Sequence, residues 1–183
     1  MSYLDSAGQW HTFAYLDLSD TRVPDESLAH LINVVDPDVA IVVSIGLDHM
    51  DWLGPDLESI GREKAGIFRA GRPAVFGTPE PPLSVRERAH ELGARLQVRG
   101  TDFDGRAVGA GGWDFTIGDR VELAALPLPS LPGPIQVANA ATALMALHQL
   151  RDRLPLSRPA IVQGLQAAQL PGRFQRVADA RGF

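Results

Sequence analysis

The clearest pattern along the chain is a β-branched apolar run at residues 39–45, between Pro37 and Gly46. Such a run predicts a strand that is buried on both faces of a parallel sheet. Two further strands are predicted at 74–77 and 95–98, and two helices at 56–68 and 82–93. Asp56 is the expected cap of the first helix, and Gly93 ends the second. Alternating strands and helices predict right-handed crossovers and an α/β fold with a partial parallel sheet and flanking helices.

The pattern changes in the second half of the chain. Glycines divide residues 103–128 into short apolar pieces, which predicts a small antiparallel β insertion. Residues 127–134 hold four prolines in eight positions and predict a rigid connector. Helices are expected at about 135–150 and 158–168, and a short helix or strand near 10–18.

Composition and charge narrow the functional classes. The 183 residues include 17 basic and 22 acidic side chains, a net charge of −5 that argues against nucleic-acid or anionic-membrane binding. No cysteine is present, which excludes disulfides, thiolate nucleophiles and iron–sulfur clusters. No apolar run is long enough to span a membrane, and the first residues lack the pattern of a secretory signal. We therefore expect a cytoplasmic protein.

Lysine is almost absent. Sixteen of the 17 basic residues are arginine, and Lys64 is the single lysine. A Walker A loop requires lysine in G-x-x-x-x-G-K-[ST], and Lys64 stands instead in Arg-Glu-Lys-Ala-Gly, so the sequence contains no Walker A motif.

Lys64 also falls near the centre of an apolar helical stripe, formed with Leu57, Ile60, Ile67 and Phe68. One interpretation is that its amine reaches solvent along the apolar stem. The other is a low-dielectric pocket, where burial would lower the pKa of the ammonium. A neutral amine there could react with carbon dioxide to give a carbamate, an anionic oxygen ligand suited to Mg²⁺. The use of arginine at every other basic position favours the second interpretation.

The loop after the first predicted strand carries the other candidate chemistry. Ligands of open parallel sheets bind beyond the carboxyl ends of strands, where residues 46–52 lie. His49 stands between Asp48 and Asp51, so its imidazole could be a metal ligand held in one tautomer by a carboxylate. The alternative is a loop histidine that bonds to the backbone, which the local sequence alone favours.

Two stretches resemble a known family: residues 44–56, SIGLDHMDWLGPD, and residues 58–69, ESIGREKAGIFR. They resemble folylpolyglutamate synthase/dihydrofolate synthase, the folate branch of the ATP-dependent Mur ligase superfamily. Sister Mur ligases share the Asp-His-x-Asp loop and the downstream lysine, whereas residues 54–68 are similar to the folate branch in particular. Residues 139–144, NAATAL, and 170–175, LPGRFQ, agree with it. The resemblance covers about residues 33–175 and implies part of a Mur-ligase central, P-loop-NTPase-like domain.

The resemblance implies roles for individual residues. His49 would bind the second Mg²⁺, and Lys64 would be the carbamylated lysine (N6-carboxylysine), with Asp48 and Asp51 supporting the loop. Asn139 would lie on the adenine side of ATP, and Arg173 would contact ATP phosphates. Without the resemblance, Asn139 is a helix-capping or surface amide and Arg173 a solvated arginine after a Pro-Gly turn.

The implied reaction is an ATP-driven ligation. A carboxylate of dihydropteroate or of a folate glutamate becomes an acyl phosphate, which the amine of L-glutamate attacks. Mg²⁺ ions offset the charge that develops during phosphoryl transfer. The resemblance further implies a monomeric enzyme without a nucleic-acid or membrane partner.

The sequence departs from the family at several positions. The Gly-Lys-Gly-Ser loop is absent, Arg22 stands where a metal-binding glutamate is expected, and Ala29-His30-Leu31 replaces the Leu-Asp-Ala that touches the pterin. The C-terminal domain, with Asp-x-Ala-His-Asn-Pro, would begin beyond Phe183. The expected organisation is an unmatched N-terminal extension at 1–32, a partial central domain at 33–170, and, at 171–183, a hinge with the start of a missing C-terminal domain.

These departures predict a truncated chain that is inactive alone. One alternative is a non-catalytic module that binds a partner through an exposed sheet edge. Another is a fragment of a cell-wall Mur ligase.

Overall fold

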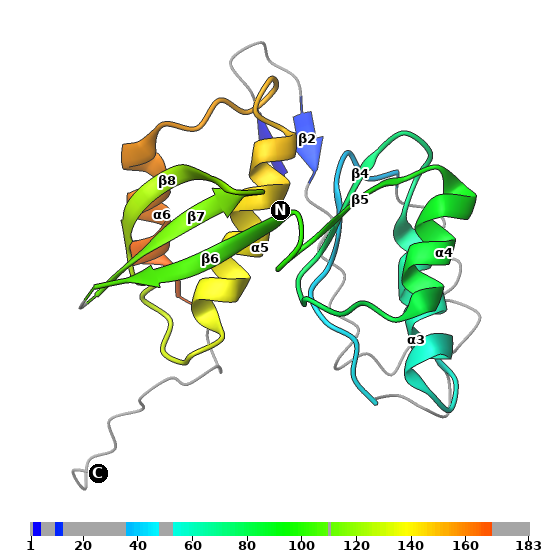
Figure 1. Ribbon diagram of the computed structural model, residues 1–183. Helices are drawn as coiled ribbons and strands as arrows, with labels where there is room; N and C mark the ends of the chain where they lie inside the picture. Colours follow the sequence, from blue (N-terminus) through cyan, green and yellow to red (C-terminus); the bar gives the residue numbers. More distant parts are fainter. Residues whose placement is uncertain (1, 5–9, 13–35, 48–52, 110, 170–183) are drawn as a thin grey trace, which may run out of the picture. The chain divides into compact units, whose positions relative to one another are not determined.

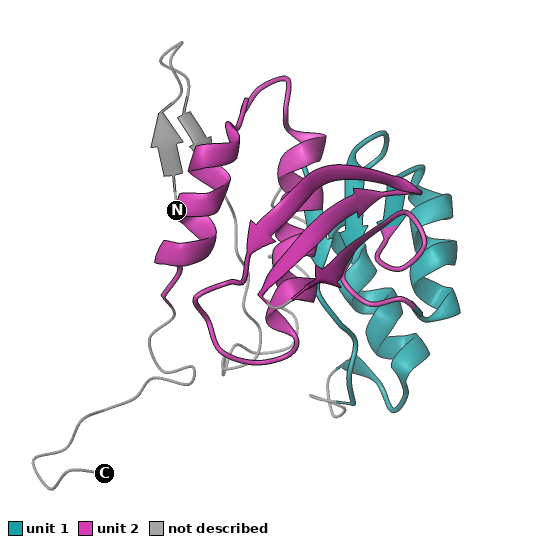
Figure 2. Ribbon diagram, turned by 60° about the vertical axis from the view of Figure 1, so that its left-hand side comes forward, with its two compact units in different colours: residues 1–76, 80–97 teal, residues 77–79, 98–183 magenta. Residues whose placement is uncertain are grey.

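The computed structural model describes residues 2–4, 10–12, 36–47, 53–109 and 111–169 (Figure 1). The chain divides into two units (Figure 2). Unit 1 comprises Met1–Phe76 and Glu80–Gln97, and unit 2 comprises Gly77–Pro79 and Val98–Phe183.

Unit 1 contains the predicted parallel pairing. Its sheet has the order β3 (Ala40–Val42), β4 (Pro73–Phe76), β5 (Arg95–Val98). β3 and β4 are parallel, with Ala40 opposite Ala74 and Val42 opposite Phe76. Helices α3 (Leu57–Lys64) and α4 (Leu83–Leu92) flank this sheet (Figure 1). The predicted α/β class, with a parallel sheet and flanking helices, is confirmed.

The first strand differs from its prediction. β3 has three residues rather than seven, and its burial alternates: Ala40 and Val42 are buried, whereas Ile41 is 42% and Val43 46% exposed. The expectation of burial on both faces is therefore wrong for β3. Among the described strands β3 stands at one end of the order, whereas β4 lies between β3 and β5 and is buried along its whole length.

Local signals set the helix ends of unit 1. Asp56 caps α3 by accepting the Ser59 N–H at 2.8 Å, and Gly93 ends α4 in the left-handed region at φ = 67°, both as predicted. The predicted continuous helix to residue 68 is wrong. α3 ends at Lys64, a 3₁₀ turn (Ala65–Ile67) follows, and Phe68 has extended backbone. The Arg69 guanidinium donates to the Gly66 and Phe68 carbonyls at 2.9 Å each.

Unit 2 confirms the predicted antiparallel insertion. β6 (Phe103–Val108), β7 (Gly112–Ile117) and β8 (Arg120–Pro127) form an antiparallel meander. Its core includes the fully buried Trp113, whose indole N–H donates to the Pro127 carbonyl at 2.9 Å. Helices α5 (Gln136–Gln149) and α6 (Arg158–Ala167) follow close to their predicted bounds.

Near the start of the chain, β1 (Ser2–Leu4) pairs with β2 (Trp10–Thr12) in antiparallel fashion. β2 matches the start of the element predicted at 10–18, and residues 13–18 lie outside the described residues. None of the described helices has the length and apolar character needed to cross a membrane.

Candidate functional site

The structure describes two of the predicted site residues. Lys64 lies in unit 1 and Asn139 in unit 2. The predictions for Asp48, His49, Asp51 and Arg173 fall outside the described residues.

Lys64 is the last residue of α3 and is half-buried. The residues three and four positions before it, Gly61 and Ile60, are both buried. Long side chains on a helix lean toward its N-terminus and lie over this preceding turn. The alkyl stem of Lys64 is therefore expected to cover buried backbone and apolar surface.

Lys64 takes part in none of the ion pairs formed within the described part of the chain. Other basic residues of unit 1 do form them, as Arg62 does with Glu91 at 3.1 Å and Arg72 with Asp38 at 2.9 Å. The half-burial of Lys64 lies between the two interpretations, an amine that reaches solvent and an amine in an apolar pocket. The carbamylation of Lys64 stays a prediction.

The start of α3 is held by two carboxylates with different targets. Asp56 accepts from the backbone N–H and the hydroxyl of Ser59 within its own helix, and these bonds lower the pKa of the Asp56 carboxyl. Glu58 accepts from the backbone of α4, and the bond from the Ser84 N–H is the main cause that lowers the pKa of the Glu58 carboxyl. Glu58 was not among the residues predicted to form the site. Its partners lie 25 and 26 positions away, so a local pattern could not reveal the contact.

Asn139 is the fourth residue of α5, whose N-cap is Ile135. It is half-buried, and its side-chain amide donates to the Gln136 side-chain oxygen at 3.2 Å. Its backbone N–H donates to the Ile135 carbonyl at 3.0 Å, as in an ordinary helical turn. The alternative that Asn139 caps this helix is therefore wrong.

The described residues alone do not form a metal site. They contain no group of three or more histidine, aspartate or glutamate side chains placed to hold an ion. Lys64 as an ammonium offers no lone pair, so it fits a cation only after conversion to a carbamate. The other predicted ligand, His49, lies outside the described residues.

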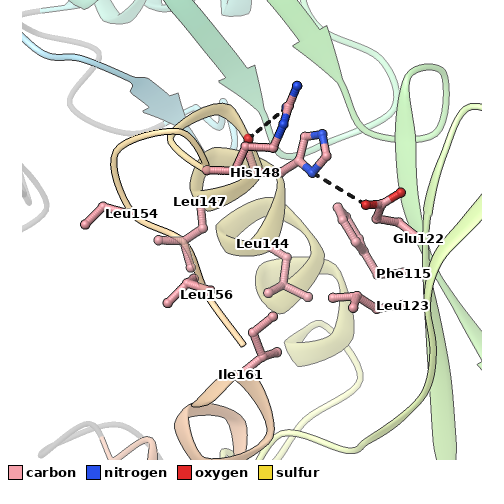
Figure 3. A pocket seen from close by; sticks show the side chains of 10 residues that line it. Phe115, Glu122, Leu123, Leu144, Leu147, His148, Leu154, Leu156 and Ile161 are labelled. Carbon is pink, nitrogen blue, oxygen red and sulfur yellow. Dashed lines mark hydrogen bonds and ion pairs between the residues drawn. The ribbon is translucent and has the colours of Figure 1, made fainter. Parts of the chain in front are cut away.

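Unit 2 holds an apolar pocket of about 210 Å³ between the β sheet, α5 and α6 (Figure 3). At one end the His148 Nδ1 lies 4.0 Å from a Glu122 oxygen. Burial lowers the pKa of the His148 imidazole, with a further contribution from Arg151, while Glu122 opposes them. Neither Lys64 nor Asn139, the two described site residues, lines this pocket. The remaining lining residues are Phe115, Leu123, Leu144, Leu147, Leu154, Leu156 and Ile161.

The amino-acid sequence is similar to curated folate enzymes. It is 51% identical over 148 residues to the dihydrofolate synthase/folylpolyglutamate synthase of Escherichia coli, covering 81% of this chain and 33% of that protein. It is 30% identical to the folylpolyglutamate synthase of Lacticaseibacillus casei, over 80% of this chain and 36% of that protein. No protein-family model matches the chain.

Solved structures of such enzymes share the fold. Escherichia coli FolC in complex with DHPP and ADP matches with a TM-score of 0.70 and 50% identity, over 80% of this chain and 34% of that one. A bifunctional folylpolyglutamate synthase/dihydrofolate synthase with Mn, AMPPNP and L-glutamate bound matches with a TM-score of 0.68 and 53% identity, over the same shares. The chain thus spans about a third of the length of these relatives.

Proposed function

Since this chain is homologous to about one third of the dihydrofolate synthase/folylpolyglutamate synthases, we propose that it carries part of the active site of an ATP-dependent ligase. The reaction joins L-glutamate to dihydropteroate or to a folate through an acyl phosphate. The observation that carries this proposal is the 51% identity to the Escherichia coli enzyme over 148 residues. The fold supports it, because the homologous structures match at TM-scores of 0.68–0.70.

The ligands of the related structures support the choice of substrates and cofactor. One holds DHPP and ADP, and another holds Mn, AMPPNP and L-glutamate. The proposal therefore includes ATP, L-glutamate and a divalent cation, with Mg²⁺ as the physiological ion. A divalent cation offsets the negative charge that develops as the phosphoryl group moves.

The roles of individual residues are part of the proposal. Lys64, as a carbamate, and His49 hold the metal, with the neighbouring Asp48 and Asp51 as supporting carboxylates. Asn139 lies on the adenine side of ATP, and Arg173 contacts its phosphates. The half-burial of Lys64 beside buried Ile60 and Gly61 supports its role, because it places part of the side chain out of solvent.

The proposal also holds that the 183-residue chain does not catalyse the reaction alone. Its single lysine stands outside any Walker A motif, so the sequence contains no lysine placed to bind the β- and γ-phosphates of ATP. Glutamate-dependent release of ADP by the purified chain would contradict this part.

A segment exchange tests the function directly. In this experiment, residues 36–169 of this chain are inserted in place of the matching segment of the Escherichia coli enzyme. The release of ADP is then measured with dihydropteroate and L-glutamate. We expect activity in the exchanged enzyme. In that background, Lys64→Arg keeps the positive charge but cannot form a carbamate, so activity should fall by at least about 100-fold.

Arg62→Lys, an exposed position two residues earlier, is the matched control and should keep the activity. An active Lys64→Arg enzyme would contradict the role of Lys64. A folded exchange enzyme without activity would contradict the ligase assignment and favour a non-catalytic module, for which Ile41 of β3 and the following Val43, both exposed, offer a surface. Ligation of an amino acid other than glutamate would favour a cell-wall ligase.

A further inference from the structure

The first turn of α4 has no cap of its own. Its N-cap residue is Pro82, whose side chain forms no capping hydrogen bond. Glu58 of α3 supplies the cap instead: one carboxylate oxygen accepts the Leu83 N–H at 3.1 Å and the other accepts the Ser84 N–H at 2.7 Å. These are two of the donors that an α-helix leaves unpaired at its start. A carboxylate is also the favoured charge at a helix N-terminus.

Ser84 makes the contact reciprocal. Its hydroxyl donates to the Glu58 backbone carbonyl at 2.7 Å, and the residue is only 7% exposed. Three hydrogen bonds therefore join the first turn of α3 to the first turn of α4. We refer to Glu58, Leu83 and Ser84 with these bonds as the Glu58 clamp.

The helices are in close contact one turn beyond the clamp. A Cβ atom on Gly61 would lie 2.9 Å from the Ser84 hydroxyl oxygen and 3.1 Å from a Val85 methyl group. The two backbones can come this close only because residue 61 is glycine. Ala65, one further turn along, is fully buried.

Lys64 lies beside this line of contacts. On a helix it is separated by about 60° from Gly61, and its side chain is expected to lean back over the turn that contains Ile60 and Gly61. The surface under the lysine stem is therefore the same turn that the clamp and the glycine contact hold against α4. The clamp is therefore expected to act on Lys64 through the packing of this turn against α4.

We propose that Glu58 is a positioning residue for Lys64: its carboxylate fixes α3 on α4 and so holds the amine at the end of α3 in one place. The functional meaning of this position rests on the proposed role of Lys64 as a carbamylated ligand. The physical claim, that the clamp orders Lys64, does not depend on ATP, metal or activity.

The full 183-residue chain offers a direct test because it contains one lysine. With ¹³C-labelled lysine, the Cε resonance reports on Lys64 alone. Reaction of its amine with an acylating reagent can be followed by peptide mass. We expect Glu58→Ala to shift or broaden the Lys64 resonance and to change its acylation rate severalfold. Glu58→Gln keeps one accepting oxygen, so its Lys64 resonance and acylation rate should lie between those of Glu58→Ala and the unaltered chain.

The control is Glu87→Ala, which removes an exposed carboxylate of α4 outside the clamp and should leave both readouts unchanged. Unchanged Lys64 readouts in Glu58→Ala, or equal changes in Glu87→Ala, would overturn the proposal. If Glu58→Ala does not fold, Ser84→Ala and Glu58→Gln decide in the same way, since each removes part of the clamp. A ¹³C-bicarbonate experiment on the same samples tests carbamate formation separately, so failure of the carbamate and failure of the clamp are distinguishable.

Discussion

The helix pair of unit 1 and the helix pair of unit 2 are held by different kinds of contact. α3 and α4 are joined by the Glu58 clamp, by the Arg62–Glu91 ion pair at 3.1 Å, and by close packing at Gly61. In unit 2, α6 has no buried residue; Arg158 donates to the Ala125 carbonyl of β8 at 3.1 Å, and Ile161 lines the 210 Å³ pocket beside α5 and the sheet (Figure 3).

The difference follows from length and composition. α3 has eight residues and is largely polar, so it is too short to be stable alone and has little apolar surface to bury. α5 has fourteen residues and buries Ala141, Leu144 and Met145 against its sheet. Hydrophobic burial is non-directional, whereas hydrogen bonds fix a distance and an angle. Directional contacts thus hold the helix that ends in Lys64.

Alanine substitutions at one glycine of each helix pair test this comparison with the largest expected effect. Gly61→Ala places a methyl group against Ser84, whose hydroxyl is hydrogen-bonded, and against the fully buried Val85. Overpacking costs about 1–3 kcal/mol and exceeds the gain in helix propensity, so we expect net destabilisation of about 1–2 kcal/mol. Gly164→Ala on α6 meets no atom within 4 Å, so it should stabilise by about 0.5–1 kcal/mol.

Urea unfolding with amide hydrogen exchange measures both effects and assigns them to helices. Exchange should accelerate in α3 and α4 for Gly61→Ala and slow in α6 for Gly164→Ala. The same sign of change for both glycines would mean that the α3–α4 contact is not tighter than the surroundings of α6.

A substitution that fills the pocket of unit 2 is expected to have the next largest effect on the free energy of unfolding. Leu123→Phe adds volume to a half-buried side chain that lines it, and filling a cavity typically stabilises by about 0.5–2 kcal/mol. Val121→Phe on the same strand is the control, because Val121 is 48% exposed and should change the free energy of unfolding little. Destabilisation by Leu123→Phe would show that unit 2 is already tightly packed there.

The sequence predicted the features whose physics is local. Asp56 and Gly93 act within four residues of their own helix ends, and both act as predicted. The Glu58 clamp was missed because its acceptor and its donors are about 25 positions apart and meet only after α4 packs on α3. Gly61 was missed for the same reason, since a helix glycine gives no local sign of a close neighbour.

The burial of strands and the geometry of the site also depend on contacts between residues that are distant in the sequence. The apolar run at 39–45 predicted a strand correctly, but not that Ile41 of β3 would be exposed in the described part of the chain. The helical stripe predicted the burial of Ile60 and Phe68, although Phe68 is reached through a 3₁₀ turn rather than along α3. The metal ligation expected of Lys64 involves residues distant in sequence, and it stays a prediction.

The smallest expected effect is a difference between the two helix pairs in how their stability depends on pH. Burial lowers the pKa of His148 below its ordinary value of 6.5, so the unfolded chain binds that proton more readily than the folded one. The stability of unit 2 should therefore fall as the pH drops below about 6.5. The effect is limited, because the His148 side chain is 24% exposed and Glu122 partly compensates the burial.

In unit 1 the corresponding group is a carboxylate. The pKa of Glu58 is lowered from about 4.5, so the contribution of the clamp is complete above that pH and is lost only as the pH falls through the lower value. Between pH 7 and 5, hydrogen exchange corrected for intrinsic rates should accelerate in α5 but not in α3 or α4, and His148→Gln should remove the change. If α5 in His148→Gln keeps the pH dependence of the unaltered chain, another group of unit 2 titrates. If α3 and α4 weaken in the same range, the clamp does not have the acidic pKa that its hydrogen bonds imply.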